Sequence, residues 1–535
     1  MRTVRGVVSA VAVLMVGGLL AACGSDDDGS VGGADRELVL ALGGESAEGY
    51  DPTLGWGRYG SPLFQSTLLA RNPDLSITTD LATDYRVSKD GLTWTVDIRK
   101  DARFTNGATV TADDVAYTFE TAAESGGLTD VTALKEARAV DADTVELVLK
   151  SPQSTFVNRL ISLGIVPKDA HGKEYASNPV GSGPFTLVDW QRGQQLVVER
   201  NKDYYGTAPA FDKVTFLFFD SEDSALAAAK AGEVDIVGVP SSLAVTEVEG
   251  MRIEAVTSVD NRGMSLPAVP NEGKRSESGV PIGNDVTSDV AVRRALNLAV
   301  DRQKLVDGVL EGYGSPAFGP ADAAPWFQPT SAIEDNDIEG AKKLLQEAGW
   351  VDSDGDGIRE KDGVKASINL VHPAGDSLRQ GLALSVADMV KPIGIEFKVA
   401  GKSWDEIEKI KHTDAILFGW GSHDPTELYN LLYSKKAGTE LLNPGFYSNP
   451  KVDAALDAAL AANSEEEAIP HWRDAQLNAE GEGSAAAADA AWVWLVNLEH
   501  TYYVSDCLDI GTPQIEPHGH GWPLTAGIAG WKRTC

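Results

Sequence analysis

The chain has 535 residues, of which 43% are hydrophobic and 23% are charged, and its formal net charge is −33 at pH 7. This acidity argues against binding to nucleic acid and against adsorption to an anionic membrane surface, because both depend on basic patches. The length exceeds what one hydrophobic core usually serves, so two or three lobes are expected.

The first 22 residues have the pattern of a secretory signal peptide. Arg2 and Arg5 precede a short apolar run that ends in small residues immediately before Cys23. This ending resembles a bacterial lipobox, which predicts that Cys23 is lipidated and becomes the first residue of the mature chain. The alternative is an ordinary cleaved signal that happens to be followed by a cysteine.

Residues 23–35 are rich in Gly, Ser and Asp and have almost no apolar side chains. Such a segment cannot build a core, so it is expected to be a flexible tether. The sequence therefore predicts a body held by a lipid anchor at the extracytoplasmic face of the cell membrane, in the periplasmic space or at the cell surface.

Strands and helices are expected to alternate along the rest of the chain. The strand candidates are 37–42, 92–98, 145–149, 214–219 and 234–239, of which 214–219 is apolar enough to be buried on both faces. Helices are expected from Thr111 onward, over 221–230, and as one longer helix from Ser288 or Asp289 to Val309. This alternation predicts an α/β body.

Beyond Cys23, only Cys507 and Cys535 remain. Two leftover thiols outside the cell tend to pair, so a disulfide between them is expected. The alternative is two free thiols.

Five blocks of the sequence resemble the signature of one family, in that family's order. The most specific is Asp90–Gly107 followed by Thr111–Val115; the others are 179–185 with 200–205, 232–236, 292–302 and 447–453. They resemble the extracytoplasmic solute-binding proteins of the peptide/nickel class of ABC importers, which are bacterial solute-binding protein family 5, of the oligopeptide/dipeptide-binding lipoprotein type. The blocks span nearly all of the mature chain.

The resemblance implies a two-lobed periplasmic-binding-protein fold of the class II type, which closes on its ligand like a flytrap and has an extra domain inserted in the first lobe. Lobe I is expected to comprise residues 36–75, 181–262 and 497–535, with the inserted subdomain at 76–180 and lobe II at 263–496. Ligand binding would shift the hinge equilibrium toward the closed form.

The resemblance further implies a monomeric receptor that captures oligopeptides or similar solutes and delivers them to a membrane permease. The ATPase that powers the importer would be a separate chain, since no Gly-rich phosphate loop is found in this one. No cofactor is expected. A receptor for nickel or a metal chelate, with nickel as cargo, is the alternative.

The strand-like run 416–420 leads into a turn that, in peptide-binding relatives, supplies an Asp for the α-amino group of the peptide. Here His423 stands near the expected Asp, and Asp424 is either its substitute or a cap for the helix that follows. Trp420 and Tyr429 flank this turn and are further ligand candidates. The departure from the family pattern puts ordinary peptide recognition in doubt.

The remaining ligand candidates come from two other segments. By family analogy the Gly-rich loop after the first strand faces the cleft, so Glu48 and Tyr50 are candidate contacts. Asn261 and Arg262 are expected near the first crossing between the lobes. Arg262 is a candidate partner for a ligand carboxylate, and a surface salt bridge is its alternative.

Two motifs suggest metal ions. His518 and His520 are two residues apart in a Gly-rich loop and are candidate metal ligands, with ordinary polar loop residues as the alternative. The turn 352–362 resembles the start of a calcium loop, but Gly363 stands where the bidentate Glu is expected, which favours a plain hairpin turn.

A secreted hydrolase is the rival class. The sequence contains no Gly-x-Ser-x-Gly elbow, no His-Glu-x-x-His pair and no obvious nucleophilic cysteine. A binding protein rather than an enzyme is therefore expected.

Overall fold

The computed structural model describes residues 36–60, 62–320, 322–518 and 521–535. The predictions for Cys23, the signal peptide, the tether and His520 lie outside these residues. Within them, no helix combines the length and the apolar character needed to cross a membrane.

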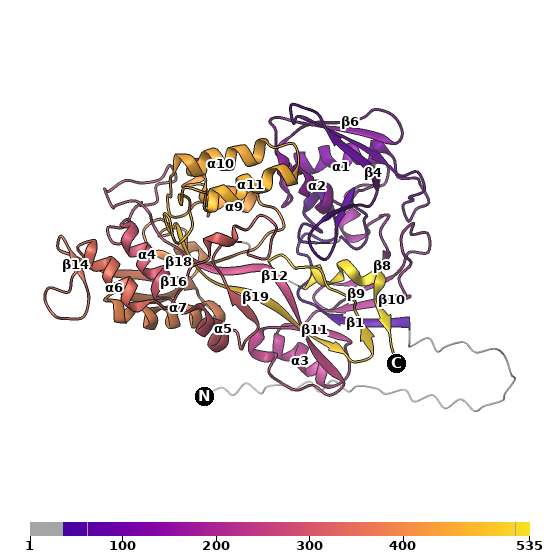
Figure 1. Cartoon of the computed structure of the whole chain (residues 1–535). Helices are drawn as coiled ribbons and strands as arrows, with labels where there is room; N and C mark the ends of the chain where they lie inside the picture. Colours follow the sequence, from indigo (N-terminus) through magenta and orange to yellow (C-terminus); the bar gives the residue numbers. More distant parts are fainter. Residues whose placement is uncertain (1–35, 61, 321, 519–520) are drawn as a thin grey trace, which may run out of the picture.

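One large mixed sheet runs through both halves of the molecule (Figure 1). Its centre is the antiparallel pair of two long strands, β12 (Met251–Ser265) and β19 (Trp492–Ser505). The register of this pair shifts between Thr257 and Asn261 and again after Arg262. The predicted lobe boundaries at 262/263 and 496/497 fall inside these two strands, so the same two strands belong to both lobes.

On one side of this pair the sheet is built from strands at the start and middle of the chain. β1 runs parallel to β10 and β11, and β9 and β8 complete this edge in antiparallel order. The strands are β1 (Glu37–Ala41), β8 (Phe185–Gln191), β9 (Gln195–Arg200), β10 (Lys213–Leu217) and β11 (Ile236–Val239), with helix α3 (Glu222–Lys230) beside them. Burial alternates along β10, so the prediction of a strand buried on both faces was wrong there.

The C-terminal segment returns to this half of the sheet. Its short strands β20 (Leu508–Asp509) and β21 (Lys532–Arg533) pair with each other, and a disulfide joins Cys507 to Cys535, with 5.1 Å between their Cα atoms. Trp531 is fully buried in the core of this half, against residues such as Leu38 and Phe216.

A separate four-stranded antiparallel sheet forms the inserted subdomain, in the order β4-β5-β7-β6. Its elements are β4 (Ala82–Val87), β5 (Thr93–Ile98), α1 (Ala112–Ser125), β6 (Leu134–Ala139), β7 (Thr144–Leu149) and α2 (Val157–Ser162). α1 begins with a capping box between Thr111 and Asp114, and its apolar face packs with Trp94 and Phe104 in the subdomain core. The hairpin of β2 (Leu69–Arg71) and β3 (Ile77–Thr79) precedes this sheet in the chain.

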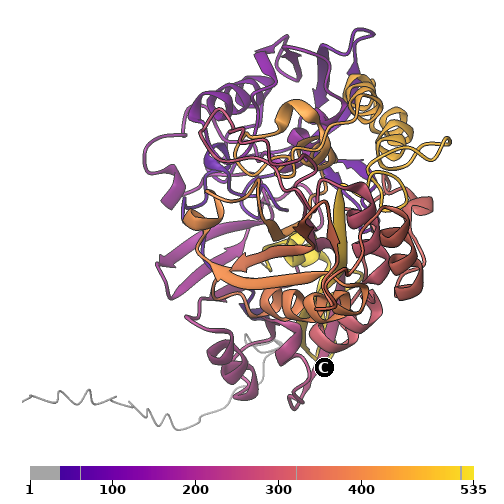
Figure 2. The same cartoon turned by 90° about the vertical axis from the view of Figure 1, so that its left-hand side faces the viewer.

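On the other side of the central pair, β18 (Ala415–Trp420), β16 (Ser367–Pro373) and β17 (Glu396–Lys402) extend the sheet, and β13 (Gly314–Pro316) pairs with β19. The helices of this half are α4 (Val290–Ala299), α5 (Arg302–Val309), α6 (Ile338–Glu347), α7 (Ser377–Val390), α8 (Trp404–Ile407), α9 (Thr426–Leu432), α10 (Pro450–Ala461) and α11 (Glu465–Gln476). In both views, α10 and α11 lie beside the inserted subdomain (Figures 1 and 2).

The single long helix predicted up to Val309 is instead two helices, α4 and α5. The chain is extended at Val300, and the Asp301 side chain accepts a hydrogen bond from the Lys304 amide at 3.1 Å. An Asp at this position caps a new helix rather than continuing the old one, because its carboxylate satisfies a free amide of the next first turn.

Candidate ligand-binding site

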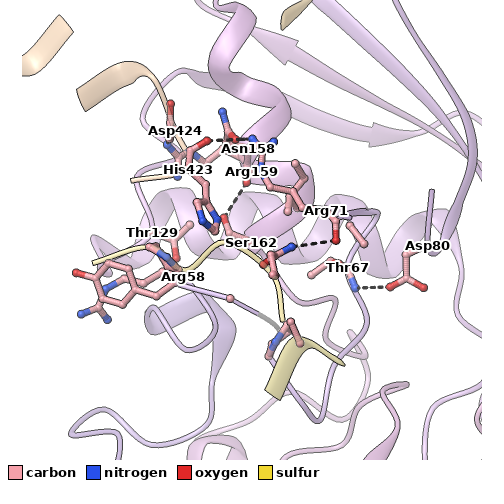
Figure 3. A pocket seen from close by; sticks show the side chains of 18 of the residues that line it. Arg58, Thr67, Arg71, Asp80, Thr129, Asn158, Arg159, Ser162, His423 and Asp424 are labelled. Carbon is pink, nitrogen blue, oxygen red and sulfur yellow. Dashed lines mark hydrogen bonds and ion pairs between the residues drawn. The ribbon is translucent and has the colours of Figure 1, made fainter. Parts of the chain in front are cut away.

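A cavity of about 830 Å³ lies where lobe I, the inserted subdomain and lobe II meet (Figure 3). Its lining comes from distant parts of the chain: residues 58–60, 62–71 and 79–80, residues 128–129 and 158–162, Pro184 and Tyr204, residues 420–424 with Asn430 and Glu440, and the C-terminal residues 514–517 and 525–529. A cavity of this volume can hold a small organic molecule or a short peptide.

Arg71, at the end of β2, ties the two sides of this cavity together. Its Nη2 donates to the side-chain oxygen of Asn158 at 2.5 Å and to the backbone oxygen of His423 at 3.0 Å. The same guanidinium lies 3.5 Å from a carboxylate oxygen of Glu465 in α11. The side chain is only 3% exposed, so these bonds are made with little competition from water.

Further bonds hold the inserted subdomain against lobe II. Arg159 in α2 forms an ion pair with Asp424. The hydroxyl of Thr426 donates to that of Thr155 at 2.9 Å, and the Ser154 hydroxyl donates to the Ala459 carbonyl at 2.8 Å. The structure therefore has the two lobes in contact around the cavity, as in a closed form.

Asp424 serves both as a helix cap and as an ion-pair partner. Oδ1 accepts from the Thr426 amide at 2.9 Å, at the start of α9, and Oδ2 pairs with Arg159. The negative charge of Asp424 is therefore already matched by a cation of the protein.

His423 presents a neutral imidazole to the cavity. Burial, followed by the nearby positive charge of Arg71, lowers the pKa of His423 to about 3. Its Nε2 has no hydrogen-bond partner among the described residues. Figure 3 shows the ring pointing into the pocket.

Of the other candidates near this turn, Trp420 lines the cavity, and its indole nitrogen has no partner within the described chain. Tyr429 is not part of the lining. Its ring stacks on Tyr433 with 4.2 Å between centroids, on the α9 side that faces α10.

The structure does not bring Glu48 or Tyr50 to the cavity. Glu48 is exposed, and Tyr50 is fully buried in a cluster of edge-to-face contacts with Trp56, Phe64 and Trp190. Such packing explains the position of Tyr50, because an aromatic ring gains most free energy where other rings surround it.

Asn261 and Arg262 lie in β12 at the crossing between the lobes, and both are buried. Arg262 donates to Asp260 at 2.5 Å, so its carboxylate partner comes from the protein, and from the interior rather than the surface. Asn261 donates to the Pro320 carbonyl. Neither residue lines the cavity.

The same Asp260 also engages both described histidines of the C-terminal region. His518 Nδ1 lies 2.8 Å from Asp260 Oδ1, and His500 lies 2.6 Å from Glu516 and 3.4 Å from Asp260. Burial lowers the pKa of His500, but its bonds to Asp260 and Glu516 outweigh this and raise the pKa to about 9. His518 therefore shares Asp260 with His500 and Arg262, and His520, the second predicted metal ligand, lies outside the described residues.

The acidic turn brings Asp352, Asp354, Asp356 and Glu360 within 4.8 Å of one another. The ammonium of Lys365 pairs with Asp354 at 3.0 Å and also with Asp356, both exposed. The strands β14 (Glu360–Lys361) and β15 (Val364–Lys365) close this segment as a hairpin, and Lys365 at its end supplies one positive charge to the four carboxylates.

Sequence reasoning missed Arg58, Arg71 and Arg159, which supply the positive charge of the cavity. Arg71 meets His423 across 352 residues of sequence, and Arg159 meets Asp424 across 265. No local pattern marks these arginines, because their partners are brought to them only by the fold.

A two-lobed α/β body whose lobes meet around a cavity has the architecture of a solute-binding protein. Residues 76–440 match the family of bacterial extracellular solute-binding proteins, family 5 (Middle). The chain belongs to this family, whose members are the substrate-binding components of ABC importers and act in transport. The predicted family, two-lobed fold and class of function are thereby confirmed.

Two curated relatives show how far the similarity extends. Protein XP55 of Streptomyces lividans is 34% identical over 544 residues, covering 98% of this chain and 95% of that protein. The oligopeptide-binding protein AppA of Bacillus subtilis is 29% identical and covers 74% of this chain and 75% of its own length.

Solved structures show the same fold. B. subtilis AppA in complex with a nonapeptide superposes with a TM-score of 0.67 at 24% identity, covering 93% of this chain and 99% of that one. NikZ of Campylobacter jejuni in complex with Ni(L-His) gives a TM-score of 0.74 at 24% identity, covering 93% and 100%.

Proposed function

We propose that this chain is a lipid-anchored receptor that captures oligopeptides or similar solutes between its lobes and delivers them to a membrane permease driven by a separate ATPase. The observation that carries the proposal is the cavity itself. Groups of both lobes enclose it, and bonds from Arg71 to His423 and from Arg159 to Asp424 join its two sides. Similarity to the oligopeptide-binding protein AppA supports peptides as the cargo class.

Native mass spectrometry of gently purified protein lacking residues 1–35 tests whether the protein carries a solute and which solute it is. We expect a monomer with a bound solute that can be released and identified. Solution scattering should show a smaller radius of gyration with that solute than after its removal. An unchanged scattering profile, or a protein that never carries a solute, would contradict capture by lobe closure.

Anchoring at Cys23 is tested in the membrane-bound form. The intact precursor should incorporate a labelled fatty acid and fractionate with membranes, whereas Cys23→Ser should abolish the label and release the protein. A labelled Cys23→Ser variant would contradict the lipobox assignment.

A receptor for nickel or a metal chelate is the second candidate, and the neutral imidazole of His423 favours it. The residue lines the cavity, and a neutral imidazole can bind a chelated metal ion through its unprotonated ring nitrogen. If this candidate is right, Ni(II) with two equivalents of L-histidine should raise the melting temperature, and His423→Ala should abolish the rise. His518→Ala should not, because His518 is bonded to Asp260.

A transport receptor is expected to return its ligand unchanged. Incubating the protein with a mixed peptide pool and analysing the products should therefore reveal no cleavage. Peptide cleavage at a rate that increases with protein concentration would support the alternative that the protein is a hydrolase.

A further inference from the structure

Some of the charged side chains that line the cavity are matched within the protein and others are not. The lining contains three arginines and three carboxylates, namely Arg58, Arg71, Arg159, Asp80, Asp424 and the exposed Glu440. Arg159 pairs with Asp424, and Arg71 lies near Glu465 in α11. Within the described chain, Arg58 and Asp80 are then the half-buried charges of the lining that have no ion-pair partner.

Arg58 is the unmatched cation. Its guanidinium carbon lies 4.5 Å from the centroid of the Tyr59 ring, and no Asp or Glu of the described residues lies within ion-pair distance of it. A guanidinium that lies over a ring still directs its N–H groups outward in its own plane, where they can bind both oxygens of a carboxylate. Arg58 therefore offers a binding position for a ligand carboxylate.

Asp80, which follows β3, is the unmatched anion. One of its oxygens accepts from the Tyr205 hydroxyl at 2.5 Å, and the other accepts from the Thr67 amide at 3.4 Å. Both donors are neutral, so they leave the negative charge of Asp80 without an opposite charge. Because each carboxylate oxygen can accept more than one hydrogen bond, Asp80 can also bind an ammonium group.

Two cations near Asp80 are already paired with other acids. Arg99 and Lys100 line a neighbouring cavity together with Asp80. Arg99 donates to Asp101 at 2.7 and 3.0 Å, and Lys100 pairs with Asp143 at 2.7 Å. Burial raises the pKa of Asp80, although its hydrogen bonds and the charge of Arg99 act in the opposite direction. An ammonium group beside Asp80 would supply the positive charge that the carboxylate lacks.

The two unmatched charges lie at opposite ends of the cavity. Figure 3 shows Arg58 at one end and Asp80 at the other, with His423 and Ser162 between them. Asp424 lies toward the Arg58 end. A ligand that spans the cavity would therefore meet a cation at one end and an anion at the other.

We propose that the cargo is a dipolar solute, such as a short peptide with free ends, which binds with its ammonium group at Asp80 and its carboxylate at Arg58. This inference rests on the proposed function and deepens it, because it names the two residues that orient the cargo. It also moves the anchor of the amino group from the turn at Asp424 to the opposite end of the cavity. The physical reason is that a partly buried charge needs a partner of opposite sign, and Asp424 already has one in Arg159.

The test measures the affinity of alanine peptides by calorimetry with the protein lacking residues 1–35. Dialanine, trialanine and tetra-alanine are compared first, and the tightest of them is then N-acetylated, amidated, or both. Each single cap should weaken binding about tenfold, as the loss of one charge-assisted bond would, and both caps together about a hundredfold. A cap at either end that leaves the affinity unchanged would overturn the inference and leave the proposed receptor function standing.

Two substitutions assign the two ends of the peptide to residues. Asp80→Asn should abolish the effect of acetylation and keep that of amidation, and Arg58→Gln should do the reverse. Asn keeps an oxygen that can accept a hydrogen bond, and melting curves check that each variant folds. Asp84→Asn and Arg86→Gln, both exposed on β4, are the matched controls and should keep both effects. An effect of acetylation that persists in Asp80→Asn would overturn the role of Asp80.

Asp424→Asn distinguishes the proposed anchor from the turn. This variant unpairs Arg159, so it should weaken the free and the acetylated peptide by the same factor. If the effect of acetylation disappears in Asp424→Asn and persists in Asp80→Asn, the amino group lies at the turn and the inference is wrong.

Solutes that co-purify with the protein provide an independent readout. The released solute should carry both an amino group, detected with an amine-specific reagent, and a carboxylate, detected by esterification. A solute that lacks either group would overturn the inference alone. Failure of all the peptides, together with protein that carries no solute, would overturn both the inference and the proposed function.

Discussion

Arg159 of the inserted subdomain and Asp424 of lobe II form an ion pair across the interface that encloses the cavity. Their side chains are 17% and 12% exposed, so the pair is screened only weakly by water. It links the turn that carries His423 to the opposite wall of the cavity.

Removing one member of this pair should open the lobes. Arg159→Met leaves the Asp424 carboxylate without its partner, which is costly in a partly buried site. We expect a larger radius of gyration in solution scattering and a lower melting temperature. The double variant Arg159→Met with Asp424→Asn should recover part of the loss, with a coupling energy of about 1–3 kcal/mol. A double variant as unstable as the sum of the single ones would show that the two side chains do not interact.

Because of His500, the stability of the folded protein should fall as the pH rises through the alkaline range. Its pKa is raised to about 9 in the folded protein, above the ordinary value of 6.5, so the folded state binds the proton more tightly than the unfolded state. The stabilising contribution is complete below about pH 6.5 and is lost as the pH rises through 9, with a magnitude of up to about 3 kcal/mol. Melting curves from pH 6.5 to 9.5 check this.

His500→Gln should flatten that pH dependence while keeping a hydrogen-bonding side chain. His471→Gln is the matched control, because His471 is not part of the Asp260 network. A wild-type melting temperature that is constant over the same range would contradict the role of His500.

The Cys507–Cys535 disulfide should stabilise the C-terminal segment against the body. It closes a sequence separation of 28 residues, for which chain entropy predicts about 3.6 kcal/mol. Cys535→Ser should lower the melting temperature and increase amide exchange in the segment after Ile510. Intact-mass analysis of the protein lacking residues 1–35 should show no alkylatable thiol, and labelling of either cysteine would contradict the pairing.

Arg302 should be among the most sensitive positions in lobe II. It is fully buried, and its guanidinium donates to the carbonyls of Ala317 and Trp494 at 2.9 Å and to the Asp335 carboxylate at 3.1 Å. Arg302→Met should cost about 3–5 kcal/mol, because it leaves these acceptors buried and unpaired.

Arg302→Lys keeps the positive charge but not the planar guanidinium with its several donors. It should therefore also destabilise the folded protein, but by less than Arg302→Met does. Denaturant unfolding of both variants measures the difference. A loss under about 1 kcal/mol for Arg302→Met would show that water replaces the guanidinium in this site.

Local sequence patterns predicted much of the architecture. The strands 37–41, 93–98 and 144–149 and the helix from Thr111 follow from alternation, β-branched residues and a capping box, which act over a few residues. The break between α4 and α5 was missed, since the apolar spacing continues past Asp301 and conceals its capping role.

The site was predictable only in part. The turn of Trp420, His423 and Asp424 lies at the cavity because a buried strand leads into it, a feature that can be read from the sequence. Glu48 and Tyr50 were placed by analogy alone, and in this chain an aromatic cluster holds Tyr50 away from the cavity.

The sequence by itself determined the class of this protein, because the family blocks and the alternating elements depend on residues close together in the chain. The tertiary structure decided which charges remain available inside the cavity. Pairing of Arg159 with Asp424 and of His518 with Asp260 joins residues more than 250 positions apart. A single sequence does not specify such distances, and they decide whether a charged side chain meets a ligand or another part of the protein.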